Sequence, residues 1–395
     1  MSSRTRAIVL AITAPVVAFA IVGGVLGTVM AREDTYQHLK IFDDVVSLIS
    51  SNYVERVDID KVMRGAMNGL VDSLDPDSAY LTPDEVKQVE SGATLPAGDL
   101  GIELTRQYYL RVLAARDNSP ASKAGLRTGD YVRAIGDVPT RDMSVWEGMR
   151  ALRGPVGSKV ALTIIRGNAA DPHVVTLTRE ALAPADVTSR VATPGIGYVR
   201  VPAIGPRTAD QVKSHVAELS KSGATKLVID VRHTASGTYD QGLALARLFV
   251  AKGTLAVRET KGAQTKDTIA ANPGDGSISL PAVVLMDNGT SGAAELFASA
   301  LRGNQRADLV GEHTIGRAGV QKLIKLPGGA GLWLTTVRYL TPAGNPLHEK
   351  GLEPTVGVES PDVEFGQPPP PTDIMLDKAI EHVQVGQTVA EKKAA

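Results

Sequence analysis

The chain has 395 residues, enough for two or three domains, and its 43% hydrophobic and 22% charged residues are typical of a folded globular protein. Its formal net charge of −1 argues against the basic character that usually marks a nucleic-acid-binding protein, so no nucleic-acid partner is expected. Because it contains no cysteine, disulfides, thiolate metal sites and thiol nucleophiles are excluded.

An uncharged apolar run occupies residues 7–31, between Arg6 and Arg32. Such a run is long enough to cross a hydrocarbon core about 30 Å thick. A cleaved signal peptide is the alternative, because residues 29–31 resemble a cleavage site, although its apolar region is normally shorter. We expect residues 1–34 to be a membrane anchor or signal segment. The positive-inside rule then places Arg4 and Arg6 in the cytoplasm. The bulk of this single-pass chain would lie on the periplasmic or extracellular side of the cell (inner) membrane.

A second segment, residues 35–97, has apolar residues at helical spacing. A helix stop and a turn at residues 74–78 precede Thr82, which with Pro83 and Glu85 predicts the start of another helix. We interpret this segment as helical packing structure. Its repeating apolar positions are Leu39, Phe42, Val45, Val46, Ile49, Val62, Met63, Ala66, Leu70 and Leu74.

Residues 98–182 contain three short blocks that occur in a fixed order. The blocks are Asp99-Leu100-Gly101-Ile102-Glu103-Leu104, Asn118-Ser119-Pro120-Ala121 and Ala124-Gly125-Leu126-Arg127-Thr128-Gly129-Asp130. Together they resemble a PDZ domain, which is mostly β with two helices. The resemblance implies that Leu100, Gly101, Ile102 and Glu103 bind a peptide and that backbone N–H groups there capture its terminal carboxylate. Physical chemistry agrees, because a Gly-containing turn lets N–H groups converge on an anion and an exposed strand edge can accept an extended peptide.

Short apolar strands alternate with helices over residues 183–366, which predicts a largely parallel, buried sheet. The expected strands are 196–201, 226–232 and 283–286, and the expected helices are 209–222, 240–249 and 293–302. Reactive groups in such sheets lie where a strand ends and a helix begins, a position occupied here by residues 287–295. Residues 367–395 are expected to form a Pro-rich linker, a short helix over 373–383 and a tail.

The most specific motifs lie between Val283 and Pro354, which read VVLMDNGTSGAAE, GRAGVQ and LTTVRYLTPAGNPLHEKGLEP in chain order. They resemble the C-terminal processing (tail-specific) serine peptidases, whose pattern runs NxGSASASE, FGKGxVQ and LTTxRYxTPxGxxIxxKGIxPD. Residues 52–85 likewise match that family's NYVExVD and SLDPxSxYLxPxE patterns. The resemblance implies an α/β multidomain fold with an N-terminal helical segment, a PDZ domain and an α/β peptidase core.

Without a gap, this alignment puts the family's nucleophilic serine on Gly292 and its general-base lysine on Arg317. Gly292 has no side chain, and Arg317 cannot act as a base because a guanidinium keeps its proton up to a pKa above about 12. Two interpretations of Arg317 stay open. It could hold a carboxylate, either that of Glu295 or a bound peptide's terminus, or it could form an ion pair that fills the space of the lysine.

Other implied site residues match the family. The resemblance implies that Gln321 orients the base, that Glu295 belongs to the site, and that the N–H groups of Ala293 and Gly237 form the oxyanion hole. The loop before Gly237 departs from the family's NPGG, with Ala235 and Ser236 in place of its proline and first glycine. This departure puts the geometry of the loop in question.

Another residue could in principle replace the serine. Ser291 is adjacent and is the candidate nucleophile, while Thr290 is one residue further away. A nucleophile must lie within about 3 Å of its base, so a shift of one residue is rarely harmless. His313, Lys322 and Lys325 are the candidate replacement bases, although a polar turn and a solvent-facing strand explain them equally well.

The seven histidines show no metal-ligand spacing, so neither a metal nor a cofactor is expected. Gly328, Gly329 and Gly331 are expected in a hairpin turn rather than a phosphate loop. We expect a protein that binds protein C-terminal tails or unfolded polypeptides and is proteolytically weak or inactive. The alternative is an active serine endopeptidase that cleaves periplasmic or exported proteins with Ser291. A homo-oligomer remains open.

Overall fold

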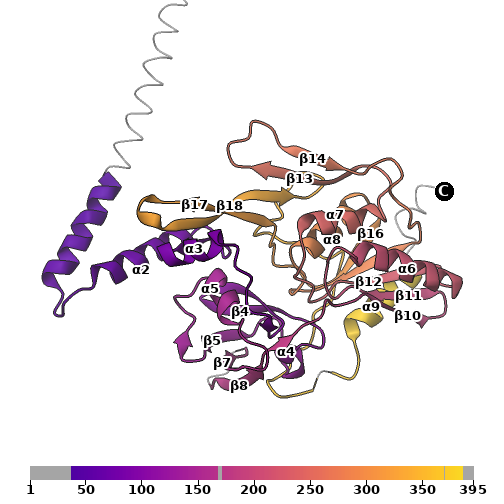
Figure 1. Cartoon of the computed structure of the whole chain (residues 1–395). Coiled ribbons are helices and arrows are strands. Elements are labelled where there is room, and N and C mark those ends of the chain that lie inside the picture. The colour runs from indigo at the N-terminus through magenta and orange to yellow at the C-terminus, as the bar shows by residue number, and fades with distance from the viewer. Residues whose placement is uncertain (1–36, 168–170, 369, 386–395) are drawn as a thin grey trace, which may run out of the picture. The chain divides into compact units, whose positions relative to one another are not determined.

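The structure is a computed structural model that describes residues 37–167, 171–368 and 370–385 (Figure 1). The chain divides into two compact units, residues 1–67 and 68–395, which we treat separately. In the first unit a helix spans residues 37–52, and α2 (Ile59–Asp72) begins after a short connection. Several large apolar side chains of the helix over 37–52 are exposed, among them Leu39 and Leu48.

Among the residues that the structure describes, none of the helices combines the length and the apolar character needed to cross a membrane. The expected anchor over residues 1–34 lies outside the described residues.

The second unit begins with the end of α2 and the predicted turn at residues 74–78. Asp75 Oδ1 accepts hydrogen bonds from the N–H groups of Asp77 and Ser78 at 2.9 and 2.8 Å, which closes the turn. The chain then forms β1 (Ala79–Leu81) and α3 (Pro83–Glu90). Thr82 and Glu85 make the reciprocal capping box at the start of α3, as the sequence predicts. This turn fixes the direction of the Asp77 carboxylate.

The PDZ region is a β-sheet of order β3-β4-β5-β7-β8, with β6 paired to β5 and with two helices. Leu100, Leu104, Leu110, Leu162 and Ile164 are fully buried in its own hydrophobic core. β3 has a strand partner on one side alone within this sheet, so its other edge is open in the described chain. The elements are β2 (Gly98–Asp99), β3 (Ile102–Gln107), β4 (Tyr109–Ala115), α4 (Pro120–Lys123), β5 (Tyr131–Ile135), β6 (Val138–Pro139), α5 (Val145–Ala151), β7 (Lys159–Ile165), β8 (His173–Thr178) and β9 (Glu180–Ala181).

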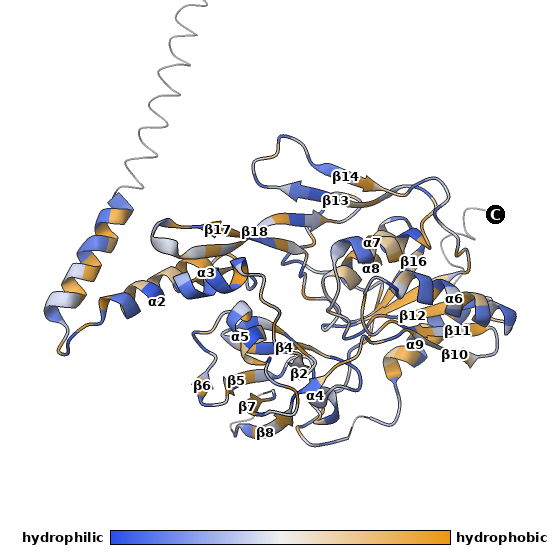
Figure 2. Cartoon of the chain, in the orientation of Figure 1, coloured by the Kyte–Doolittle hydropathy of each residue, from blue (hydrophilic) through white to orange (hydrophobic). Residues whose placement is uncertain are grey.

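The α/β core has a six-stranded sheet of order β10-β11-β12-β15-β16-β19, parallel except for the β10–β11 pair. Because side chains alternate along a strand, Leu227 and Ile229 pack with α6, α7 and α8 on one face, while Val228 packs with α9 on the other. Figure 2 shows these central strands as the most apolar part of the region. The elements are β10 (Thr188–Thr193), β11 (Ile196–Arg200), α6 (Thr208–Lys221), β12 (Lys226–Asp230), α7 (Tyr239–Arg247), β15 (Ala282–Met286), α8 (Ala293–Gly303), β16 (Ala307–Gly311), β19 (Val356–Gly357) and α9 (Ile374–Val385).

A second sheet of the core has the order β1-β18-β13-β14, with β17 also paired to β18. The strands are β13 (Thr254–Thr260), β14 (Asp267–Ala270), β17 (Gly319–Lys325) and β18 (Gly331–Leu340), and the short helix η1 (Pro327–Gly329) turns the β17–β18 hairpin. Gly328 and Gly329 therefore lie in the hairpin connection, as predicted, whereas Gly331 is the first residue of β18. Because β1 also pairs with β18, this sheet brings the Asp75–Ser78 turn towards the residues that precede β17.

The PDZ region and the core are connected by an ion pair and by ring stacking. The guanidinium of Arg200 in β11 holds the Asp117 carboxylate through two contacts of 3.0 Å. The ring of Phe365, in the segment after β19, stacks on His173 of β8 at 4.6 Å between centroids. These contacts connect the two regions within one compact unit.

Candidate active site

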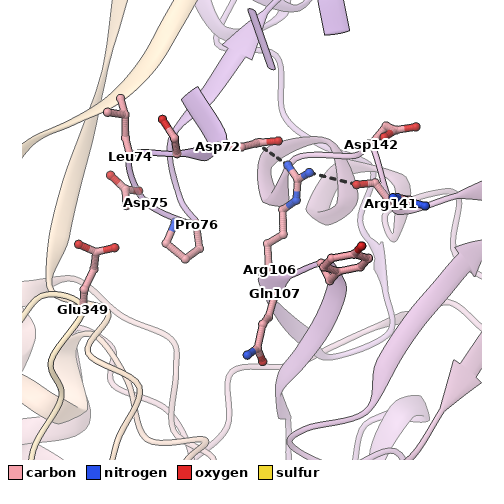
Figure 3. Close-up of a pocket in the computed structure, with 11 residues that line it drawn as sticks. Asp72, Leu74, Asp75, Pro76, Arg106, Gln107, Arg141, Asp142 and Glu349 are labelled. Carbon is pink, nitrogen blue, oxygen red and sulfur yellow. Dashed lines mark hydrogen bonds and ion pairs between the residues drawn. The ribbon is translucent and has the colours of Figure 1, made fainter. Parts of the chain in front are cut away.

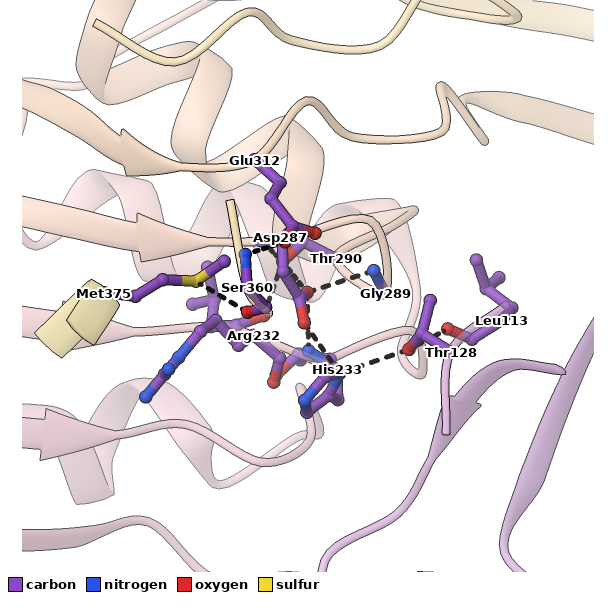
Figure 4. Close-up of polar contacts among 12 residues, drawn as sticks. Leu113, Thr128, Arg232, His233, Asp287, Gly289, Thr290, Glu312, Ser360 and Met375 are labelled. Atoms are coloured by element: carbon purple, nitrogen blue, oxygen red, sulfur yellow. Dashed lines mark hydrogen bonds and ion pairs between the residues drawn. The ribbon is translucent and has the colours of Figure 1, made fainter. Parts of the chain in front are cut away.

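The turn between β15 and α8 is held by Asp287. Its Oδ1 accepts hydrogen bonds from the N–H groups of His233 and Gly289 and from Thr290 Oγ1, at 2.9, 3.0 and 3.1 Å (Figure 4). Ser291 N–H then donates to the carbonyl of Thr234 at 3.0 Å. The ends of β12 and β15 are thereby joined where a parallel sheet presents its reactive groups.

Gly292 occupies the N-cap of α8 with φ +62° and ψ −118°, a conformation that residues with a side chain rarely adopt. A Cβ at this position would have the Arg317 carbonyl at 3.8 Å and the Ala235 carbonyl at 4.0 Å as its nearest neighbours. Space for a small side chain is therefore present. A sharp, strained turn between a strand and a helix is also how hydrolases expose a nucleophilic serine.

Two backbone amides flank this turn without internal partners. Within the described chain, neither Ala293 N–H nor Gly237 N–H donates a hydrogen bond. Gly237 has φ +113°, and a Cβ there would collide with the carbonyl of Ile204. Ala235 and Ser236 have no positive φ, so the loop does not depend on a glycine at position 236. The substitutions at positions 235 and 236 therefore retain Gly237, which is the glycine that the loop conformation requires.

Glu295 is completely buried at the third position of α8 and connects both sides of the site. Its Oε2 accepts from the N–H groups of Gly292 and Arg317 at 3.1 and 2.8 Å, and its Oε1 accepts from Gly316 N–H at 2.7 Å and from the Thr314 hydroxyl. Burial raises the pKa of Glu295 to about 7, although these donors oppose the shift. Glu295 is therefore a positioning residue that ties the α8 turn to the loop of Arg317.

The guanidinium of Arg317 contacts Asp77 rather than Glu295. Its Nη2 lies 2.9 Å from Asp77 Oδ1, and its Nε donates to Asp77 Oδ2 at 3.2 Å. Nη1 lies 4.0 Å from a carboxylate oxygen of Glu103 in β3. Of the open alternatives for Arg317, a contact between the guanidinium and the Glu295 carboxylate is not formed in the described structure, where that carboxylate binds the backbone N–H of Arg317 instead. Asp77 raises the pKa of Arg317, which outweighs the effect of burial.

The hydroxyl of Ser291 is fully buried, and it has no hydrogen-bond partner among the described residues. The three candidate bases are engaged elsewhere or exposed. His313 Nε2 lies 3.6 Å from Glu353, Lys325 pairs with Glu90, and Lys322 is exposed on β17. The structure brings none of them into hydrogen-bond contact with Ser291.

Gln321 also points to other partners. Its side-chain N–H donates to Thr335 Oγ1 at 3.0 Å and to the Gly319 carbonyl at 3.3 Å, both in the β17–β18 hairpin. It makes no hydrogen bond to the guanidinium of Arg317 in the described structure.

An imidazole and a carboxylate meet beside the turn. His233 Nδ1 lies 2.7 Å from Asp287 Oδ2 and 3.2 Å from Thr128 Oγ1 of the PDZ region (Figure 4). Attraction to Asp287 raises the pKa of His233 against the effect of burial. Burial would raise the pKa of Asp287, but His233 and the hydrogen bonds outweigh it and hold the value at about 2. The pair links the core to the PDZ region.

In the PDZ region the predicted carboxylate-binding amides already have an acceptor. Leu100 N–H and Gly101 N–H donate to Asp99 Oδ1 at 2.7 and 3.1 Å. Asp99 Oδ2 pairs with Arg153 at 2.9 Å. The loop before β3 therefore does bind a carboxylate, but one that belongs to this chain.

A cavity of about 530 Å³ lies at the C-terminal end of β3 (Figure 3). Arg106, Gln107 and Tyr108 line it together with the 72–76 segment and Glu349. Arg106 crosses it to the Asp72 carboxylate and the Arg141 carbonyl. Neither Gly292 nor Arg317 lines this cavity, so it is separate from the expected chemical centre.

Comparison with known proteins decides the family. Peptidase family S41 matches residues 195–358, the PDZ domain matches residues 111–166, and the N-terminal domain of the activating protease CtpB matches residues 25–85. The carboxyl-terminal-processing protease of Synechocystis sp. is 30% identical over 338 residues, which cover 84% of this chain and 79% of the relative. The carboxy-terminal-processing protease of Bartonella bacilliformis is 31% identical over 337 residues, covering 84% and 77%. This chain belongs to the carboxyl-terminal processing protease family.

The fold of a solved relative agrees with this assignment. The photosystem II D1 C-terminal processing protease superposes with a TM-score of 0.66 at 26% identity, over 80% of this chain and 92% of that chain. The predicted family and α/β multidomain fold with a PDZ domain are thereby confirmed.

Within this carboxyl-terminal processing protease fold, sequence reasoning missed three acidic residues that determine the electrostatics of the site. Asp77 falls on an unspecified position of the pattern SLDPxSxYLxPxE, and its contact with Arg317 spans 240 residues. Asp99 directly precedes the predicted carboxylate-binding residues, and the ability of an Asp side chain to accept from nearby backbone N–H groups is a local sequence signal. The His233–Asp287 pair had the weaker signal that both residues directly follow predicted strands.

Proposed function

We propose that this protein binds the C-terminal tails of other proteins through its PDZ domain and cleaves them weakly or not at all. The observation that carries the proposal is the pair at the expected chemical centre. A glycine stands at the nucleophile position, and an arginine neutralised by a buried carboxylate stands at the base position.

The charge at position 317 argues against general-base catalysis. A Ser-Lys dyad requires an amine that can lose its proton near neutral pH. The guanidinium of Arg317 holds its proton far above that range, and Asp77 raises its pKa further. A base at this position would need a different side chain.

The burial of Ser291 argues against the alternative, an active endopeptidase that uses this hydroxyl. A nucleophile must reach both the substrate carbonyl and a base. Ser291 Oγ is buried and has no hydrogen-bond partner in the described chain. Its backbone N–H bonds to Thr234, which fixes the residue on the inner side of the turn.

The open edge of β3 supports the peptide-binding half of the proposal. An extended peptide can pair with such an edge as an added strand, with its terminal carboxylate near residues 100–102. Glu103 lies on the same strand, and its Oε2 is 4.0 Å from Arg317 Nη1. A peptide on β3 would therefore run beside the expected chemical centre. Tails bound there are the candidate partners.

Two measurements test the proposal. Incubation of the purified protein with an unfolded substrate that has an apolar C-terminus should give no turnover above background. Turnover that disappears in Ser291→Ala would refute inactivity and support the alternative.

The second measurement is a titration of a labelled apolar tail peptide, either with a free C-terminus or with an amidated one. PDZ capture requires the carboxylate, so the free acid should bind more tightly than the amide. Equal binding of both forms, or none, would contradict tail recognition and favour a purely structural role.

We also propose that the apolar run over residues 7–31 inserts in the cell membrane and leaves the PDZ domain and the core on the outer side. The support is the length of the run and the position of Arg4 and Arg6 before it. Protease accessibility of the PDZ domain in intact and permeabilised cells would test this. If cells whose outer envelope has been removed resist digestion until the cell membrane itself is lysed, the proposed orientation is wrong.

A further inference from the structure

The loop that should receive a tail carboxylate holds an internal one. Asp99 Oδ1 accepts from Leu100 N–H and Gly101 N–H at 2.7 and 3.1 Å, and Asp99 Oδ2 lies 2.9 Å from Arg153 Nη2. The side chain of Asp99 is mostly buried, with 14% of its surface exposed. Two amides and one guanidinium therefore bind this carboxylate on both oxygens.

The third amide of the loop has a different direction. Ile102 lies opposite Ala115, and Arg116 N–H donates to the carbonyl of Gly101 at 2.8 Å. In an antiparallel pair this register makes Ile102–Ala115 a non-hydrogen-bonded pair, so Ile102 N–H faces the open edge of β3. A peptide on that edge would thus find Ile102 N–H available but Leu100 N–H and Gly101 N–H occupied.

We propose that Asp99 is an intramolecular competitor for the tail carboxylate and that it sets the affinity of the PDZ domain for tails. The inference rests on the proposed tail-binding function and deepens it. To place its terminal carboxylate on Leu100 N–H and Gly101 N–H, a tail must displace an ionised acceptor that already satisfies them. Arg153 stabilises the occupied state because it neutralises Asp99 there.

The two possible roles of Asp99, competitor or structural residue, predict opposite effects of its removal on tail binding. If Asp99 served to shape the loop alone, its removal would loosen the subsite and weaken tail binding. If Asp99 competes, its removal leaves Leu100 N–H, Gly101 N–H and Arg153 free for the incoming carboxylate. Hydrogen bonds to charged groups are among the stronger ones in proteins, so the gain should be measurable.

The test is fluorescence anisotropy on the full-length chain with a labelled apolar tail peptide, as free acid and as amide. Asp99→Ala should lower the Kd of the free acid about tenfold, which corresponds to about 1.4 kcal/mol. The Kd of the amidated peptide should stay unchanged. Asp99→Asn, which retains a neutral acceptor for the two amides, should give an intermediate gain and preserve the loop if alanine does not.

Asp137→Ala is the matched control, because Asp137 is exposed in the same domain and its loss changes the net charge equally. This variant should bind both peptides like the wild type. Thermal unfolding of each variant checks that the domain stays folded.

The outcomes separate the two levels of the proposal. If the free acid binds the wild type but Asp99→Ala and Asp99→Asn bind it equally or more weakly, Asp99 does not compete and tail binding stands. If the amidated peptide gains as much as the free acid, the effect does not arise at the carboxylate subsite and the inference is also overturned. If the free acid binds neither the wild type nor any variant, both the inference and the proposed function fail.

Discussion

Two pairs of backbone amides in this molecule lie where the family resemblance implies that an anion binds, and they differ in their acceptors. Ala293 N–H and Gly237 N–H, beside the turn into α8, donate to nothing in the described chain. Leu100 N–H and Gly101 N–H, before β3, donate to the carboxylate of Asp99. The first pair is unsatisfied next to a residue without a side chain, whereas the second pair is satisfied by a side chain of the same loop.

The difference concerns two separate tasks of a tail-specific protease, which are stabilising the transition state and binding the tail. Free amides suit the oxyanion of a transition state, which forms only during catalysis. Occupied amides suit a ligand that must compete for entry. Under the proposed function, the N–H groups of Ala293 and Gly237 would be free to stabilise a transition state although position 292 carries no nucleophile. Those of Leu100 and Gly101 would bind a tail only in competition with Asp99.

Restoring the chemical side chains is the strongest way to test whether the free amides are poised for catalysis. Gly292→Ser with Arg317→Lys should give detectable cleavage of an unfolded substrate. However, Asp77 would keep a lysine at 317 protonated, because a carboxylate within about 4–6 Å raises the pKa of an amine. Adding Asp77→Asn should therefore raise the cleavage rate at neutral pH by a further factor of about ten, since each pKa unit changes the neutral fraction tenfold.

Gly292→Ala with Arg317→Lys and Asp77→Asn is the control, because it lacks the hydroxyl and should stay inactive. Absence of cleavage in the folded serine triple variant would mean that the amides of Ala293 and Gly237 are not placed for an oxyanion. A triple variant no faster than the double would show that Asp77 does not control the base.

Glu295 holds the turn at Gly292, next to the unsatisfied amide of Ala293. Its titration should make the free energy of unfolding depend on pH. Its folded-state pKa of about 7 lies above the ordinary 4.5. The stability that it contributes is therefore fully present below pH 4.5 and is lost as the pH rises through 7. The expected loss between pH 4.5 and 8 is about 3 kcal/mol.

Urea unfolding of the wild type and of Glu295→Gln across this pH range measures the effect. The variant should lack this part of the pH dependence. It should also be less stable at pH 5, by about 2 kcal/mol, because the new NH₂ group faces backbone donors. A variant with the wild-type slope would assign the titration to another group.

Variants of the Arg317–Asp77 pair test whether Arg317 is a structural cation or one that binds a ligand. Arg317→Met should destabilise the protein by about 2 kcal/mol, because it leaves the Asp77 carboxylate buried without its cation. Asp77→Asn combined with Arg317→Met should recover most of this loss. Chemical denaturation of the two single variants and the double variant gives the coupling energy, and a coupling near zero would mean that the pair adds nothing to stability.

Ser291→Ala should have the smallest effect. Removing a buried hydroxyl without a hydrogen-bond partner should leave the protein as stable or up to about 1 kcal/mol more stable. A clear loss in thermal stability would indicate that the hydroxyl makes a favourable contact in solution. Ser299→Ala, which removes another buried hydroxyl without a partner, provides the comparison.

The sequence predicted the parts of the fold that depend on local pattern. The strand over 283–286 and the helix over 293–302 correspond to β15 (Ala282–Met286) and α8 (Ala293–Gly303), because a short apolar run and a helical repeat are local signals. The β13 and β14 strands were not anticipated. Their side chains are mostly intermediate or exposed, so they lack the apolar run that marks a buried strand.

The candidate site was predictable in its positions but not in its contacts. Motif spacing identified positions 292 and 317, and elementary chemistry indicated that arginine cannot be a general base. The partner of Arg317 depends on β1 pairing with β18, which places Asp77 near a residue 240 positions away. No local pattern contains that pairing. The hydrogen bonds from Leu100 N–H and Gly101 N–H to Asp99 are local, and an Asp directly before this loop is a sequence signal for an Asx turn.

The salt bridge between Arg317 and Asp77 also restricts how this protein could change by single mutations. Replacing the arginine alone by lysine leaves an amine that its neighbour keeps charged, and replacing Gly292 alone by serine introduces backbone strain of about 1–3 kcal/mol without a base to use it. Neither of these two replacements is expected to give cleavage by itself. Under the proposed function, hydrolysis would therefore require concerted changes at positions 292 and 317, and a further change at Asp77 to favour the neutral amine.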